Sequence, residues 1–200
     1  MVTKNFFKRL ILIISILSLT GCAGSNKYMK EVSGEAIKTT PNKEEVSVIF
    51  MRPSGFGFAI SSSVFDLTGD TDTFVGIVSA KKKIVYKTKP GEHMFMVIGE
   101  SADFMKADLR GEKIYYVLVT PRMGVWKARF SLQPVSRSEL SSADFNDWVN
   151  SCTYTENTDD SYTWAKDNAP SIQSKKSEYL PEWYKKSESD RPFLKAEDAL

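Results

Sequence analysis

Residues 114–119 have the sequence IYYVLV, which is apolar at odd and even positions alike. Successive side chains of a strand point to opposite faces of its sheet, so this stretch predicts a central strand that is covered on both sides. Residues 125–132 (VWKARFSL) follow a different pattern, because apolar and polar side chains alternate from Trp126 to Leu132. That alternation predicts a strand with one buried and one exposed face.

Strand-like segments occur throughout residues 46–134, where short stretches rich in Val, Ile, Phe and Tyr are separated by Gly, Pro and charged clusters. Further strands are predicted at residues 46–52, 61–67, 74–78, 83–88 and 93–99. About seven strands at this spacing predict a mainly β fold, either an antiparallel β-sandwich-like domain or a partly open barrel.

The turn sequences support this prediction. Lys89-Pro90-Gly91-Glu92 places Pro at the second and Gly at the third turn position, as a type II turn requires. We expect this turn to close a hairpin between the strands on either side. Arg110-Gly111 and residues 121–124 indicate two further reversals.

The periodicity becomes helical after Pro134. Four side chains at the spacing i, i+3, i+4 and i+7 predict one helix: Phe145, Trp148, Val149 and Cys152.

Ser141 and Asp144 give this helix a start similar to a capping box. Residues 153–160 predict a loop, and residues 171–179 predict a second helix that breaks or restarts at Pro181, which has no N–H to donate. We therefore expect residues 136–200 to form a small helical C-terminal appendage to a β domain of residues 46–135.

The N-terminus has the outline of an export signal. Lys4, Lys8 and Arg9 form a positive region, and residues 10–19 (LILIISILSL) form an apolar core. This core is too short for an uncleaved anchor, because about 20 apolar residues are needed to cross a bilayer.

The next four residues, Leu19-Thr20-Gly21-Cys22, resemble the lipobox of bacterial prolipoproteins. The resemblance implies cleavage of a signal peptide of residues 1–21. It also implies a diacylglyceryl group on the Cys22 thiol and an acyl chain such as palmitate on its new amino group. Residues 22–45 are polar and are expected to form a flexible tether to the membrane. Ala23 rather than Asp follows the cysteine, which in this family implies the outer membrane, facing the periplasm, in a Gram-negative cell.

Charge does not favour a nucleic-acid partner. The whole chain carries a formal net charge of +2, but residues 1–21 hold three basic and no acidic side chains, so the mature chain has a net charge of −1. Neither nucleic-acid binding nor a polybasic membrane patch is predicted. The chain has two cysteines, and lipid uses Cys22. Cys152 therefore has no partner for an intramolecular disulfide and is expected to be buried.

Several landmarks within residues 46–134 resemble a family of small bacterial lipoproteins. Their shared domain has no assigned function and is related in shape to the PEGA domains of surface-layer proteins. The landmarks are Arg52-Pro53, Asp66, Gly76, the "PG-x-H" turn Pro90-Gly91-Glu92-His93 and the "G-x-x-[YF]-YV" strand of residues 111–117. The resemblance implies a fold and a location rather than a catalytic activity. The stretch 66–74 and the helical third of the chain depart from the pattern.

Catalytic and metal motifs are weak. His93 is the only histidine, and a side chain after a turn is expected to bond a neighbouring carbonyl. A triad of His93 with Asp66 and one of the serines 61–63 lacks a nucleophile elbow. No metal site is predicted, since residues 69–72 (GDTD) do not continue as a calcium loop. The glycine-rich residues 54–58 and the lysines 81–83 are predicted to be a loop and a charged turn.

Aromatic side chains gather in the C-terminal third beside Asp and Asn. They either pack the helices onto the sheet or form a binding surface for sugars or peptides. The candidates for that surface are Trp148, Trp164, Tyr179 and Trp183, with Tyr154, Tyr162 and Tyr184 nearby.

The expected protein is a lipid-anchored envelope lipoprotein with a non-enzymatic interaction or structural role. Its expected partners are the membrane, bound through the lipid on Cys22, and an envelope protein or cell-wall component. No separate cofactor is expected. Two alternatives stay open: a hydrolase acting on the cell wall, and a module that binds a small molecule or glycan.

Overall fold

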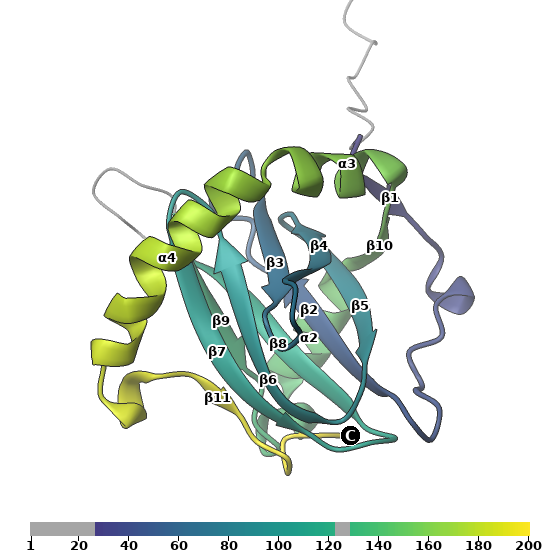
Figure 1. Cartoon of the computed structure of the whole chain (residues 1–200). Helices are drawn as coiled ribbons and strands as arrows, with labels where there is room; N and C mark the ends of the chain where they lie inside the picture. Colours follow the sequence, from purple (N-terminus) through teal and green to yellow (C-terminus); the bar gives the residue numbers. More distant parts are fainter. Residues whose placement is uncertain (1–26, 123–128) are drawn as a thin grey trace, which may run out of the picture.

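The computed structural model describes residues 27–122 and 129–200. Over these residues the fold is mainly β, with eleven strands in two facing sheets and three α-helices outside them (Figure 1). The predicted sandwich is confirmed in outline. The sheets do not close into a barrel over the described residues, and there are more strands than the seven or so predicted.

The first sheet has six strands. Their order is β1 (Met29–Glu31), β10 (Thr153–Asn157), β5 (Lys82–Thr88), β2 (Val46–Arg52), β8 (Ile114–Arg122) and β9 (Arg129–Pro134). The pairs β2–β8 and β10–β5 are parallel and the others are antiparallel.

The second sheet has five strands. Their order is β11 (Phe193–Leu194), β7 (Ala102–Leu109), β6 (Gly91–Ile98), β3 (Ser62–Asp66) and β4 (Thr73–Val78). Strand β11 lies parallel to β7. The expectation of purely antiparallel sheets was therefore wrong, because three strands reach their neighbours through long crossovers that sequence periodicity does not reveal.

The turn at Pro90-Gly91 corrects a second prediction. Gly91 has a positive φ of 134°, as the turn chemistry predicts. However, β5 pairs with β2 and β10, whereas β6 pairs with β3 and β7. The turn therefore passes from one sheet to the other and does not close a hairpin. A turn sequence specifies a reversal of the chain but not which sheet receives the next strand.

The central strand predicted from residues 114–119 is confirmed. In β8, Tyr115, Val117 and Val119 pack between the two sheets, while Tyr116 and Leu118 pack on the outer face. Five other predicted strands match β2 to β6 within two residues at each end. The strand predicted at residues 125–132 matches β9 from residue 129 onward; residues 125–128 lie outside the described residues.

Helices cover both outer faces of the sandwich. Helix α2 (Ala143–Ser151) packs on the six-stranded sheet, and α4 (Ala169–Lys185) follows α3 (Asp159–Asp167) across the five-stranded sheet (Figure 1). The cap of α2 is Ser142, whose Oγ accepts a hydrogen bond from the N–H of Phe145, not Ser141 as predicted. Short 3-10 turns occur at Gly34–Ala36, Glu139–Ser141 and Glu188–Asp190.

Two predictions about the C-terminal third were wrong. Residues 153–160 are not a loop, because Thr153–Asn157 forms β10 between β1 and β5. Helix α4 continues through Pro181. The hydrogen bond that proline removes is offset by packing, since Trp183 is 2% exposed and its ring meets that of Phe104 edge to face.

The predicted appendage and tether both contribute strands. Strands β10 and β11 belong to the two sheets, so residues 136–200 are built into the sandwich and are not appended to it. Within the predicted tether, β1 pairs with β10 and Met29 is buried. Over the described residues, no helix is long and apolar enough to cross a membrane.

Candidate functional site

The side chains of Asp66 and His93 meet at one end of the sandwich. Asp66 ends β3 and His93 lies near the start of β6, and both are more than 90% buried. Nδ1 of His93 lies 2.8 Å from Oδ2 of Asp66, and Nε2 of His93 donates to the carbonyl oxygen of Lys89 at 2.9 Å. The expectation that His93 bonds a turn carbonyl is confirmed. The imidazole thus fastens the corner between β5 and β6 to the end of β3.

The hydrogen bonds indicate the charges of this pair. The carbonyl of Lys89 can only accept, so Nε2 carries a proton. Oδ2 of Asp66 accepts from the hydroxyl of Tyr86 at 3.0 Å, and Oδ1 accepts from the backbone N–H of Thr68 at 3.0 Å and from its hydroxyl. A carboxylate surrounded by donors is ionised, and it then binds an imidazolium that donates from both nitrogens.

The pKa values follow from these contacts. Burial alone would lower the pKa of His93, but the hydrogen bond and charge of Asp66 outweigh burial and raise it above 6.5. Burial would raise the pKa of Asp66, yet its bonds to His93 and Thr68 lower it below 3.8. Burial and the charge of Asp66 raise the pKa of Tyr86 to about 12, which keeps its hydroxyl protonated as a donor.

The imagined triad does not assemble. Ser61 bonds the hydroxyl of Ser79, and Ser62 donates to the carbonyl of Val78, which places both away from His93. Ser62 and Ser63 begin strand β3, whereas Asp66 ends it. The geometry therefore fits a charged structural clamp between the sheets better than a nucleophile with its base.

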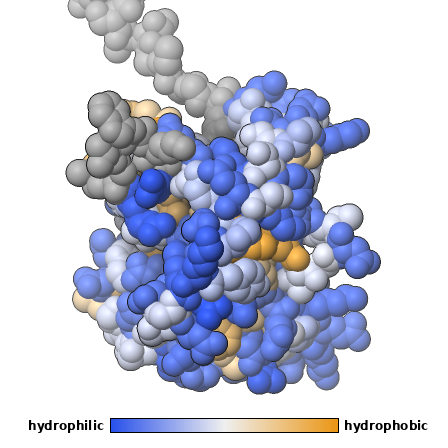
Figure 2. All heavy atoms as spheres, turned by 60° about the vertical axis from the view of Figure 1, so that its left-hand side comes forward, coloured by the Kyte–Doolittle hydropathy of each residue, from blue (hydrophilic) through white to orange (hydrophobic). Residues whose placement is uncertain are grey.

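A groove of about 510 Å³ opens beside this clamp, between the outer face of β6 and β7 and the segment that follows α4. We call it the C-terminal groove. Tyr184 and Phe193 expose about half of their surface there, and Nζ of Lys106 lies 5.7 Å from the centre of the Tyr184 ring. Arg191 lies over the ring of Trp183. Its Nε and the Trp183 Nε1 are buried and have no hydrogen-bond partner among the residues that the structure describes. On the face shown in Figure 2, hydrophilic residues predominate and hydrophobic ones appear as small separate areas.

The four aromatic candidates for a binding surface divide between the two faces of the sandwich. Trp148 packs against the cluster beneath α2, while Trp164, Tyr179 and Trp183 pack against the cluster beneath α4. Trp164 also lies within 6.3 Å of the Tyr28 ring, measured between ring centres. Of the four, Trp183 alone lines the C-terminal groove. Tyr154 lies under Lys83, and Tyr162 packs edge to face on Phe74.

Arg52 lies at the opposite end of the sandwich from His93 and has a role that its sequence pattern does not predict. Its side chain is fully buried and lies 4.8 Å from the centre of the Phe130 ring. The guanidinium donates to the carbonyl oxygens of Ile60 at 2.6 Å, Phe56 at 2.7 Å and Gly57 at 2.8 Å. Burial lowers the pKa of Arg52. The sequence did offer one signal for this role, because Arg52 ends an apolar strand just before a glycine-rich loop.

The other charged motifs also serve the fold. Asp72 binds Lys176 at 2.7 Å and Gln173 at 2.6 Å, which fastens α4 to the loop after β3. Lys83 is buried and donates to the carbonyl of Val149 at 2.6 Å. Cys152 is a buried free thiol, as expected, and burial raises its pKa. Over the described residues, no three His, Cys, Asp or Glu side chains are placed to hold a metal ion.

Comparison with known proteins gives no match for the chain. No protein-family model matches it, and no curated protein is significantly similar to it. The lipidation candidate Cys22 lies outside the described residues. The site residues must therefore be interpreted from their own chemistry.

Proposed function

We propose that the mature protein begins at a lipidated Cys22 and acts as a non-enzymatic binding module on the surface of a cell-envelope membrane. The observation that carries this proposal is the sequence Leu19-Thr20-Gly21-Cys22 after an apolar run of export-signal length. Its likeness to small bacterial lipoproteins supports the same assignment. Two or more acyl chains give stable anchoring, whereas one chain alone binds only marginally.

The buried clamp argues against His93 as a general base. A general base must reach its substrate with a free nitrogen. Both ring nitrogens of His93 are engaged, with Asp66 and with the Lys89 carbonyl. A cell-wall hydrolase would have to place its acid and base elsewhere.

Membrane fractionation tests the anchoring. Wild-type protein is expected in the membrane fraction after a high-salt wash, because acyl chains do not depend on ionic contacts. The Cys22→Ser variant is expected to leave that fraction. Because Ala23 follows the cysteine, a Gram-negative host should hold the wild type in the outer membrane. Wild-type protein that washes off with salt would contradict lipid anchoring.

A specific observation favours glycan binding as the second candidate function. The C-terminal groove combines two half-exposed rings, Tyr184 and Phe193, with the charged side chains of Lys106 and Glu188. Rings of this kind stack on sugars at a small cost in conformational entropy.

Calorimetric titration with soluble cell-wall glycan fragments is expected to show binding that Tyr184→Ala weakens. The matched control is Tyr162→Ala, because Tyr162 is similarly exposed but lies outside the groove. Equal binding by both variants would exclude the groove.

A further inference from the structure

We infer that residues 54–60 form an apolar loop that enters the membrane interface and sets the orientation of the domain on the lipid surface. We call this segment, with the sequence SGFGFAI, the 54–60 loop. The inference rests on the proposed lipid anchor at Cys22 and adds a second point of contact with the membrane.

The loop exposes its apolar side chains. Phe58 is 79% exposed, Phe56 is 56% exposed and Ile60 is 42% exposed. These three side chains are clustered within five residues of a segment that carries no charge. Clustered exposed apolar side chains of this kind mark contact with a protein or a membrane.

Part of the loop backbone is already hydrogen-bonded within the protein. Moving a carbonyl out of water costs free energy unless the carbonyl is hydrogen-bonded. Arg52 already binds the carbonyl oxygens of Phe56, Gly57 and Ile60 from beneath. The N–H of Ile60 also donates to the Gly57 carbonyl, and the N–H of Phe56 donates to the hydroxyl of Ser54. The loop can therefore lose water from its surface without leaving these groups unpaired.

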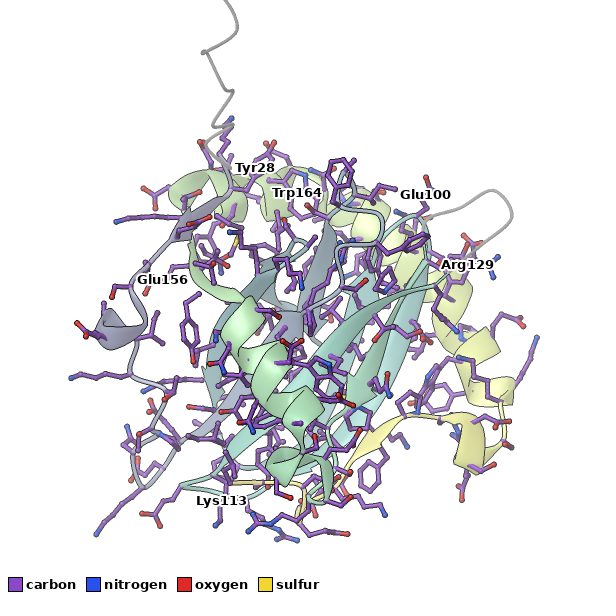
Figure 3. All side chains as sticks on the ribbon, turned by 180° about the vertical axis from the view of Figure 1, so that it is seen from behind. Tyr28, Glu100, Lys113, Arg129, Glu156 and Trp164 are labelled. Carbon is purple, nitrogen blue, oxygen red and sulfur yellow. The ribbon has the colours of Figure 1, made fainter. Side chains whose placement is uncertain are left out.

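The position of the loop agrees with the expected anchor. Ala59 and Ile60 line the same cavity as Tyr28, Trp164 and Gly99, a space of about 470 Å³ at one end of the sandwich. Figure 3 shows Tyr28, Trp164 and Glu100 together at that end and Lys113 at the opposite end. We call the first the Tyr28 end.

The length of chain between the anchor and the domain limits the distance to the membrane. Four residues lie between Cys22 and Lys27, where the described domain begins, so five Cα–Cα steps join the two positions. Fully extended, these five steps span at most about 18 Å. The polar layer on each side of the hydrocarbon is roughly 5 to 7 Å thick. The Tyr28 end is therefore held close to the lipid, and the 54–60 loop lies at that end.

The 54–60 loop offers apolar contact and carries no charge of its own. At the Tyr28 end, Lys27 lies 3.8 Å from the carboxylate of Asp160, and Lys82 forms an ion pair with Glu31. Neighbouring carboxylates thus offset these two lysines. The proposed partner is consequently any fluid phospholipid surface, with no requirement for anionic lipid.

Depth-dependent fluorescence quenching tests the inference on the full lipidated chain. The variant Phe58→Cys carries an environment-sensitive thiol dye, and the protein is reconstituted in neutral phosphatidylcholine vesicles containing nitroxide lipid labelled near the head group. Lys113→Cys is the control position, because Lys113 is exposed at the far end. Cys152 is replaced by Ser in every variant so that one thiol reacts.

We expect the dye at position 58 to shift to shorter wavelength and lose most of its emission, while the dye at position 113 keeps its emission. Flotation of the same samples distinguishes the two proposals. Protein that floats with the vesicles but shows equal emission at both positions would overturn loop insertion and leave the anchor standing. Protein that does not float would overturn the anchor, and loop insertion with it.

A second dye position outside the loop tests insertion without altering the loop, since Phe58→Cys replaces one of the rings proposed to insert. Lys81 is exposed, and its N–H donates to the Arg52 carbonyl at 2.8 Å, so it lies beside the loop. A dye on Lys81→Cys should be quenched, and Phe56→Ser with Phe58→Ser should relieve that quenching. Phe193→Ser is the matched control, since Phe193 is 46% exposed but lies in the C-terminal groove. Quenching that survives the double substitution would contradict the role given to the two rings.

Discussion

The imidazole of His93 donates to the carboxylate of Asp66 across 2.8 Å, inside a network from which water is almost excluded. The two residues are 27 positions apart and belong to neighbouring strands of the five-stranded sheet. The pair also forms hydrogen bonds with Tyr86, which lies in β5 of the six-stranded sheet, and with the carbonyl of Lys89 in the turn after β5. A single buried charge pair thus ties the two sheets together at the end opposite the 54–60 loop.

This pair predicts a pH dependence of stability. The pKa of His93 is raised above 6.5, so its contribution is complete below pH 6.5 and is lost as the pH rises through the folded pKa. The pKa of Asp66 is lowered below 3.8, so its contribution is complete above pH 3.8 and is lost as the pH falls through the folded pKa. The pair should stabilise most between these values. Urea unfolding followed by tryptophan fluorescence at a series of pH values checks the trend.

Substitution of His93 isolates the contribution of the pair. His93→Gln leaves a buried carboxylate without its counter-charge and is expected to lower the free energy of unfolding by about 3 kcal/mol at pH 6. Asp66→Asn combined with His93→Gln removes both charges and should cost less than the single change. The loss of stability above pH 6.5 should disappear in the double variant. If the double variant kept the wild-type pH dependence, another group would have to be its source.

Arg52 is predicted to order the 54–60 loop. Arg52→Met removes three hydrogen bonds to loop carbonyls, some of which water can replace, and is expected to cost about 2 kcal/mol. Arg52→Lys should behave similarly, because an ammonium group cannot match the planar fork of a guanidinium. Limited digestion with chymotrypsin should cut faster after Phe56 and Phe58 in both variants. Unchanged digestion rates would show that the loop holds its shape without Arg52.

The end of the chain is fastened by Tyr115. Its buried hydroxyl donates to the Ala196 carbonyl at 3.0 Å and accepts from the N–H of Arg110 at 2.9 Å. Tyr115→Phe leaves both groups without this partner and is expected to cost about 2 kcal/mol. Amide exchange in residues 195–200 should become faster. Tyr184→Phe is the control, because its half-exposed side chain should change stability by less than about 0.5 kcal/mol; equal losses in the two variants would contradict the fastening role.

The strands that could be predicted are those whose own apolar sequence indicates a strand. Strands β2 and β8 are long apolar runs, and both are covered on two faces. Strand β7 was missed because Asp103 and Lys106 interrupt its apolar pattern. Asp103 is nevertheless buried, and it binds Ser131, Arg122 and Lys186 from distant parts of the chain. Strand β10 was missed because its short polar sequence becomes a strand only through pairing with β1 and β5.

The same limit applies to the candidate sites. Asp66 and His93 could be named from residue type, but their contact depends on the turn that passes between the sheets. Arg52 gives no signal in a hydropathy pattern, because its three partners are backbone carbonyls. The exposure of Phe56 and Phe58 could not be predicted from their apolar character, which favours burial.

Intact-protein mass spectrometry of the membrane-extracted protein tests the central claim most directly. We predict a mature species that lacks residues 1–21 and carries the mass of a diacylglyceryl group and an N-linked acyl chain on Cys22. The Cys22→Ser variant should carry no acyl mass. A wild-type protein with an unmodified Cys22, or with residues 1–21 still attached, would contradict the lipid anchor.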